Sequence, residues 1–182
     1  MRRLVTIGLV LMTLGCTGPG GASQAAPTAD GQSAVQTDGR FELRFTLAKT
    51  SWRSDEAIEG AAVLSLTEGD PIELGGSAGG PLAFSFREAG GTREMGPAYD
   101  AACTAAKLET AHPIVVEIRK SGGWADDQPD ADFYRAFFAD PLVRLPAGDW
   151  DISALAEFID DRDCAAGTQH SMRATIRVHI TG

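Results

Sequence analysis

The chain is poor in the residues that most often bind metals or carry catalysis. It has three histidines and three cysteines in 182 residues. His112, His170 and His179 form no H-x-x-x-H or H-E-x-x-H pattern, and the cysteines form no C-x-x-C pattern. These are the usual spacings of zinc sites and redox pairs. We therefore expect the histidines at surface or turn positions, and the sequence predicts neither an enzyme nor a cofactor.

Basic residues are also scarce. The chain has 16 Lys and Arg against 25 Asp and Glu, for a formal net charge of -9. No Lys/Arg cluster offers contacts to phosphates, and an acidic surface repels nucleic acid and anionic lipid headgroups. The composition therefore argues against nucleic acid as a partner.

The chain also has no apolar run long enough to span a membrane. Its longest apolar run is residues 4–14. It follows Arg2 and Arg3 and ends at Gly15-Cys16. A membrane-spanning helix needs about 20 apolar residues, whereas a basic start, a short apolar run and a small-residue exit are typical of a signal peptide. The layout resembles that of bacterial lipoproteins, which implies a signal peptide over residues 1–15 and lipidation of Cys16.

The alternative is an ordinary secretory signal, because Thr13 and Leu14 depart from the usual residues before a lipidated cysteine. Stable anchoring takes more than one acyl chain, which a diacylated or triacylated Cys16 would supply. We expect an extracytoplasmic protein anchored to a bacterial membrane by lipid on Cys16.

Residues 17–39 are rich in Gly, Ser, Ala, Gln, Thr and Pro, with almost no large apolar residue. Such a segment buries too little surface to offset the entropy of ordering. We interpret residues 16–39 as the lipidated cysteine and a flexible tether. Residues 40–182 are then one domain, long enough for a single core.

Apolar and polar residues alternate through most of this domain, which buries one face of each predicted strand. The predicted strands are 41–47, 58–66, 71–74, 82–86, 114–118, 150–158 and 172–180. Turn signals separate them, including the glycine-rich stretch 75–80. The pattern predicts an all-β fold, with two antiparallel sheets packed face to face as a β-sandwich.

Residues 130–139 break the alternation, because Phe133, Phe137 and Phe138 have near-helical spacing. We predict a short helical segment here, capped by Asp130 and ended by Pro141. Its aromatic face would close one end of the sandwich.

Cys103 and Cys164 are the only cysteines left once Cys16 is lipidated. Two cysteines in an exported protein usually pair. We predict a structural disulfide that joins the Cys103 loop to the hairpin turn before the last strand.

Residues 75–79 match the G-x-S-x-G pattern around Ser77. That pattern marks a nucleophile only where a strand delivers the serine and a helix follows. Here Pro81 and the predicted strand 82–86 follow instead, so we interpret the stretch as a turn. A small serine hydrolase using Ser77 is the least favoured alternative.

Four loop carboxylates are the weaker candidates for a calcium site: Asp126, Asp127, Asp130 and Asp132. Carboxylate oxygens suit Ca²⁺, but the spacing is not that of an EF-hand. Solvated loop charge is the favoured interpretation.

Trp52, Trp124 and Trp150 are the aromatic residues that raise the question of a binding surface. Trp150 continues the inward pattern of its strand, and Trp52 is placed to plug a sandwich end. If an aromatic side chain contacts a ligand, we expect Trp124, with Tyr134 nearby in sequence. Packing of Trp124 against the Phe133 segment is the favoured competing interpretation.

Two stretches, residues 47–58 and 145–152, carry a resemblance to a known class of domain. The first is similar to the "aromatic, two residues, Gly-Glu-x-Ile" opening of many bacterial immunoglobulin-like sandwiches, with Asp55 in place of the usual Gly. The second resembles their "Leu-Pro-x-Gly-x-aromatic" entry to a late strand. The chain resembles poorly characterised lipoproteins with one such domain, and the BsuPI-type proteinase-inhibitor sandwich has a similar opening.

This resemblance implies an immunoglobulin-like β-sandwich and supplies no catalytic residue. The sequence as a whole predicts a lipid-anchored binding or structural module without catalysis, whose partner is an envelope protein or a glycan. The alternative is a proteinase inhibitor that acts through an exposed loop, 122–132 or 75–80.

Overall fold

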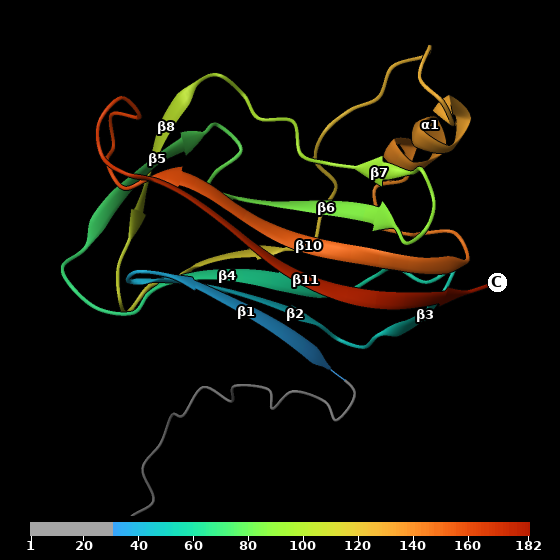
Figure 1. Ribbon diagram of the computed structural model, residues 1–182, viewed down its shortest axis with the longest axis horizontal. Helices are drawn as coiled ribbons and strands as arrows, with labels where there is room; N and C mark the ends of the chain where they lie inside the picture. The colour runs from blue at the N-terminus through green and yellow to red at the C-terminus, as the bar shows by residue number, and fades with distance from the viewer. Residues whose placement is uncertain (1–30) are drawn as a thin grey trace, which may run out of the picture.

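The computed structural model describes residues 31–182 (Figure 1). The predicted signal peptide, the lipidation at Cys16 and the first part of the tether lie outside the described residues. The described part contains eleven strands and one helix. They are β1 (Gln32–Asp38), β2 (Phe41–Leu47), β3 (Ser51–Arg53), β4 (Gly60–Leu66), β5 (Ile72–Ser77), β6 (Leu82–Glu88), β7 (Glu94–Met95), β8 (Cys103–Leu108), β9 (Ile114–Glu117), α1 (Ala131–Ala139), β10 (Gly148–Ile159) and β11 (Gln169–Thr181).

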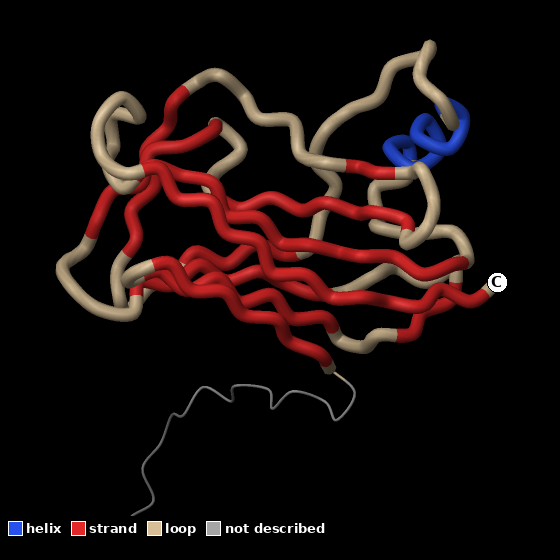
Figure 2. The backbone as a smooth tube through the Cα atoms, in the orientation of Figure 1, coloured by secondary structure: helices blue, strands red, loops and turns tan. Residues whose placement is uncertain are grey.

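The strands form two layers, as the backbone trace in Figure 2 shows. The smaller sheet has the order β1-β2-β4-β9, with every pair antiparallel. The larger, seven-stranded sheet is built on the long hairpin of β10 and β11. On the side away from β11, β10 pairs with β6 along most of its length and with β5 at Ile159. β5 in turn pairs with β8. The prediction of an all-β sandwich with one short helical segment is confirmed.

One pairing differs from the predicted antiparallel arrangement. β3 runs parallel to the end of β11, with Trp52 opposite Ile180. Trp52 is 5% exposed, and its indole N–H donates to the carbonyl of Lys49 at 3.2 Å. The buried ring holds this three-residue strand against the sheet, and it fills the end of the sandwich as predicted.

The core lies between the sheets and is made by the inward residues of the alternating strands. The fully buried large side chains include Trp150, Phe41, Phe45, Phe84, Phe86, Leu43, Leu47, Leu64 and Leu82. β10 differs from the simple alternation, because its outward residues Asp151, Ser153 and Leu155 are buried as well. The centre of the larger sheet is therefore covered on both faces.

The prediction of a flexible tether through residue 39 is wrong for Gln32–Asp38, which form β1. β1 and β2 are joined by a two-residue turn in which Gly39 has a φ of 57°, a hairpin conformation that glycine adopts without strain. The side chains of β1 are largely exposed. The strand is held by backbone pairing with β2 and by contacts to β11, neither of which depends on large apolar residues.

The main side-chain contact of β1 uses His170, which the sequence placed in a turn. His170 instead lies in β11, is 9% exposed and is stacked on Phe158 with ring centroids 5.0 Å apart. Its Nδ1 lies 2.7 Å from Asp38 Oδ2, and its Nε2 lies 3.7 Å from Asp160 Oδ2. The histidine therefore joins the end of β1 to the larger sheet.

The helix α1 begins and ends almost where the sequence predicted. Asp130 occupies the N-cap position but has a left-handed φ of 59° and makes no side-chain cap, so the predicted capping role is wrong. Asp140 is extended at the other end, as expected for a residue before proline. Phe133 stacks on Trp150 at 6.2 Å and Phe137 meets Phe86 at 5.7 Å. These contacts confirm that the helix closes one end of the core.

Within residues 31–182, the single helix has neither the length nor the apolar character needed to cross a membrane.

The glycine-rich stretch 75–80 is only partly the predicted turn, because β5 continues through Gly75 and Gly76 to Ser77. Gly75 lies against the β10–β11 turn, where an added Cβ would meet the carbonyl oxygen of Asp161 and lie 2.8 Å from Cys164 Sγ. Its lack of a side chain thus permits close packing rather than a tight turn.

Candidate functional site

A groove lies along the β5 end of the larger sheet. It consists of two adjoining cavities of about 220 and 270 Å³ that share Ser77 and Tyr99 in their walls. We call this pair of cavities the Tyr99 groove. The first cavity also contains Asp100, Glu157 and Gln169. The second is walled by Leu82, Ala83, Pro97, Ala98, Gly79, Gly80, Arg119, Lys120 and Ser121.

The groove collects residues that are far apart in the chain. Ser77 ends β5, Tyr99 and Asp100 lie between β7 and β8, and Glu157 lies on β10. Pairing of β5 with β8 brings Ser77 opposite Cys103 and so draws the segment before β8 over the sheet. Figure 1 shows this segment crossing above the sheet from β7 to β8.

Hydrogen bonds fix the backbone that follows Tyr99. The N–H of Asp100 donates to Ser77 Oγ at 2.9 Å, and the N–H of Ala102 donates to Asp100 Oδ1 at 3.0 Å. Thr104 Oγ1 donates to the carbonyl of Ser77 at 3.0 Å. Ser77 therefore acts as an acceptor that holds the Tyr99 segment, and no histidine lines the groove within the described residues.

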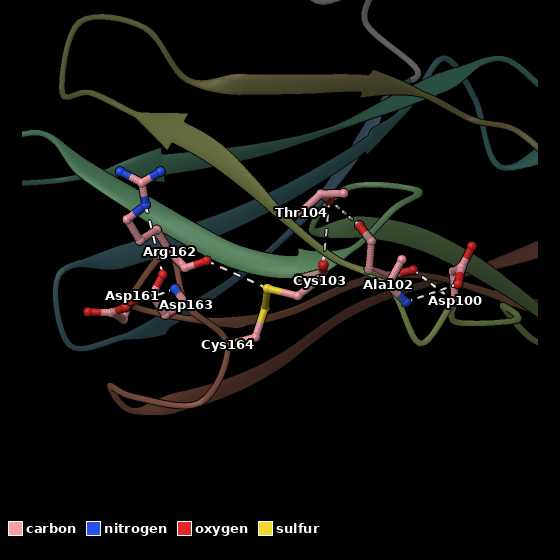
Figure 3. The surroundings of a disulfide bond; sticks show 10 residues. Asp100, Ala102, Cys103, Thr104, Asp161, Arg162, Asp163 and Cys164 are labelled. Atoms are coloured by element: carbon pink, nitrogen blue, oxygen red, sulfur yellow. Dashed lines mark hydrogen bonds and ion pairs between the residues drawn. A yellow bond between two sulfur atoms is a disulfide. The ribbon is translucent and has the colours of Figure 1, made fainter.

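The predicted disulfide between Cys103 and Cys164 is present, with a Cα–Cα distance of 6.1 Å (Figure 3). Cys103 begins strand β8 rather than lying in a loop, whereas Cys164 does lie in the turn between β10 and β11. Cys164 also forms part of the wall of the first cavity. The bond thus fixes the turn, the start of β8 and one wall of the groove to one another.

The turn itself has a constrained backbone. Cys164 has a φ of 44°, an uncommon value for a residue other than glycine. The N–H of Asp163 donates to Asp161 Oδ1 at 2.9 Å, and Arg162 reaches Glu73 on β5 at 3.3 Å. Figure 3 shows Asp161, Arg162 and Asp163 beside the sulfur atoms.

Tyr99 is the one aromatic residue among the exposed large hydrophobic side chains of residues 31–182, and it is 45% exposed. The pKa of its hydroxyl is raised, first because the ring is partly desolvated and then because the Glu157 carboxylate lies nearby. The phenol therefore stays protonated at any ordinary pH and retains an O–H donor. An exposed aromatic ring that ends in a hydroxyl suits a binding surface that is partly apolar and partly hydrated.

The structure places the two aromatic residues predicted for ligand contact elsewhere. Tyr134 is 8% exposed, and its hydroxyl accepts the N–H of Glu94 at 3.1 Å. Trp124 is half-buried against the core, and the guanidinium of Arg135 lies 4.8 Å from its ring centroid. The favoured interpretation of Trp124 as a packing residue agrees with this geometry, and Tyr134 offers little free surface.

The four carboxylates suggested for calcium do not converge. Arg135 bridges two of them, reaching Asp126 at 2.8 Å and Asp132 at 2.6 Å. Asp130 instead lies 3.9 Å from Arg93. Across residues 31–182, no group of three or more acidic, cysteine or histidine side chains is arranged to hold a metal ion.

Sequence reasoning missed the Tyr99 groove. Tyr99 is a single aromatic residue in the stretch Gly96-Pro97-Ala98-Tyr99-Asp100. Its isolation in a loop of small residues was the one available signal. Its partners Ser77 and Glu157 are assembled by sheet pairing, which the pattern of β8 did not reveal.

Comparison of the chain with models of known protein families, with curated proteins and with solved structures gives no match in any of the three.

Proposed function

We propose that this protein is a lipid-anchored extracytoplasmic binding module, without catalysis of its own, that contacts its ligand through the Tyr99 groove. The observation that carries the proposal is the exposed Tyr99 ring in the wall shared by two cavities, on a segment whose backbone is tied to Ser77 at Asp100 and to the disulfide at Cys103. A backbone segment held in place before binding loses little entropy when a ligand arrives. The ligand is an envelope protein or a glycan.

The membrane attachment rests on the sequence around Cys16. Lipidation would leave the domain on a tether of about 15 residues before β1, which at roughly 3.3 Å per extended residue reaches several tens of ångströms from the bilayer. Intact-mass measurement of membrane-purified protein tests it. We expect the mass of an acylated chain that begins at Cys16 and release of a Cys16→Ser variant into the soluble fraction. An unmodified Cys16 would remove the anchor.

A photo-crosslinking amino acid in place of Tyr99 tests the binding site in living cells. We expect a discrete crosslinked species from position 99 and none from Val35, which is equally exposed at 47% but lies in the smaller sheet. A third variant at Asp127 probes the loop 122–132. Crosslinks from Asp127 alone would favour the proteinase-inhibitor alternative, and no crosslink from position 99 would contradict the proposal.

A further inference from the structure

The first cavity of the Tyr99 groove is acidic. Asp100 follows Tyr99 in the chain, and Glu157 is the neighbour that raises the pKa of the Tyr99 hydroxyl. Within the described residues, no lysine, arginine or histidine lines this cavity, and neither Asp100 nor Glu157 has an ion-pair partner within 4.0 Å. Two carboxylates therefore flank the aromatic ring. Arg173 lies close enough to oppose the rise in the pKa of the Tyr99 hydroxyl, but it makes no ion pair with either carboxylate.

The basic residues closest to the groove are engaged with other groups. Arg119 donates to the carbonyl of Gly79 at 3.0 Å, and Arg173 points its guanidinium toward Ser85 Oγ at 3.5 Å. Lys120 donates to the carbonyls of Phe137 and Asp140 at the end of α1. These contacts leave both carboxylates of the first cavity without an ion pair, although Asp100 Oδ1 already accepts the N–H of Ala102.

The size of the first cavity limits the kind of cationic group that can enter it. Pockets for drug-sized molecules are typically about 300–1,000 Å³, and the first cavity, at about 220 Å³, suits one long side chain. The adjoining cavity has apolar walls that include Leu82, Pro97 and Ala98, and it can take the next residue of the same chain. The net charge of -9 favours approach of a cationic partner.

We propose that the first cavity binds a lysine or arginine side chain of a partner protein, with the cation against the Tyr99 ring and paired with Glu157 and Asp100. Cation–π contact and charge-assisted hydrogen bonds to carboxylates act together in such a site. This inference rests on the proposed binding function and names the chemistry of the partner. A glycan presents neutral hydroxyls, which leave the two negative charges unbalanced.

The test measures binding of short peptides to the purified full-length protein by calorimetry at low and physiological salt. The probes are hexa-arginine and hexa-lysine, with hexa-glutamine, hexa-glutamate and a neutral chitin hexasaccharide for comparison. We expect the basic peptides to bind, and salt to weaken them. We expect about a tenfold loss of affinity in Glu157→Gln and in Tyr99→Ala, since each removes one charged or cation–π contact.

Two matched variants separate this site from general acidity and from misfolding. Glu68→Gln removes an exposed carboxylate outside the groove, and we expect roughly unchanged affinity there. Tyr99→Phe keeps the ring and should retain most of the binding. Equal losses in Glu157→Gln and Glu68→Gln, no binding of basic peptides, or Tyr99-dependent binding of the hexasaccharide alone would each overturn the inference. If the inference fails in one of these ways, a crosslink from position 99 in cells would still support the proposed binding function. The two proposals can therefore fail independently.

Discussion

At the scale of single residues, Asp151 shows how the outer face of the larger sheet is held. Its carboxylate receives Arg177 Nε at 2.8 Å and Arg87 at 3.0 Å, from the strands on either side of β10. Asp151 is 8% exposed although it lies on the predicted polar face. The two arginines account for this, because their side chains cover the carboxylate while their own ends remain in solvent.

Hydrogen bonds from Arg177, and then from Arg87, hold the pKa of Asp151 below its ordinary value. A carboxyl with a lowered folded-state pKa stabilises the fold above the unfolded-state pKa of about 3.9, and that contribution disappears as the pH falls through the folded-state value. We expect Asp151→Asn to lower the free energy of unfolding at pH 7 by on the order of 1 kcal/mol. The difference from wild type should shrink below about pH 4, as measured by urea unfolding across pH. A difference that is constant with pH would contradict this.

Gly75 is the second residue with a specific requirement. The β10–β11 turn lies so close to β5 that a methyl group would come within 3.1 Å of Cys164 N and 2.8 Å of its Sγ. Neither the turn nor the disulfide can yield without moving the other, since the bond joins them.

We therefore expect Gly75→Ala to destabilise the protein by about 1–3 kcal/mol, the usual cost of overpacking a tight contact. Gly79→Ala is the matched control, because nothing lies within 4 Å of the position of its added Cβ. Thermal unfolding of both variants measures the difference. Similar melting temperatures would show that the turn relaxes at little cost.

At the scale of elements, β1 is the strand with the weakest sequence signal and the most specific attachment. Its residues are Gln-Ser-Ala-Val-Gln-Thr-Asp, and only Ala34 and Asp38 are even half-buried. Gln36 Oε1 accepts the N–H of Arg173, and Asp38 meets His170. Side-chain contacts of this kind are not visible in a hydropathy pattern, which explains why the segment was interpreted as tether.

Removing the Asp38 carboxylate should loosen β1 before it affects the core. In Asp38→Ala we expect faster amide hydrogen exchange over residues 32–38 and in the turn that contains Asp160, with α1 unchanged, because His170 loses its main partner. Thr37→Ala serves as the control, since Thr37 is exposed and contributes its backbone alone to the pairing with Glu42. Faster exchange in both variants alike would point to general fraying of the hairpin.

The elements found from sequence are those with strong period-two alternation, such as β2, β10 and β11, and the helix with its three phenylalanines. β8, Cys-Thr-Ala-Ala-Lys-Leu, has a single large buried residue, Leu108, so its strand structure comes from pairing with β5. Because the Tyr99 groove depends on that pairing, the site could not be predicted either. The disulfide could be predicted, because an exported protein with two cysteines left after lipidation usually pairs them.

At the scale of the whole molecule, the sandwich is fixed differently at its two ends. Figure 1 shows α1 at one end and the turn between β10 and β11 at the other. The helix end is closed by packed aromatic rings, whereas the opposite end, which carries the groove, is tied by the Cys103–Cys164 bond. The covalent tie at this end adds to the packing of Phe41, Phe158 and His170 beside the turn.

Replacing both Cys103 and Cys164 with serine should lower the free energy of unfolding substantially. The cysteines are 61 residues apart, and closure of a loop of this length contributes up to about 4 kcal/mol in the chain-entropy treatment. Urea unfolding of the double variant and of the oxidised wild-type protein measures the difference in the free energy of unfolding. Thiol alkylation followed by intact-mass measurement confirms that the wild-type protein contains the disulfide. A loss below about 1 kcal/mol would mean that the unfolded chain gains little freedom from its removal.

The position of β1 has a consequence for solubility. β11 is thirteen residues long, and beyond its short parallel pairing with β3 its outer edge is accompanied by β1. A long strand edge left bare is a template for pairing with another molecule. A shortened chain that starts at Arg40 would keep its apolar core and its disulfide, yet it would present this edge to its neighbours. We therefore expect the seven residues of β1 to limit self-association, because they pair with the edge of β2 and lie along the edge of β11.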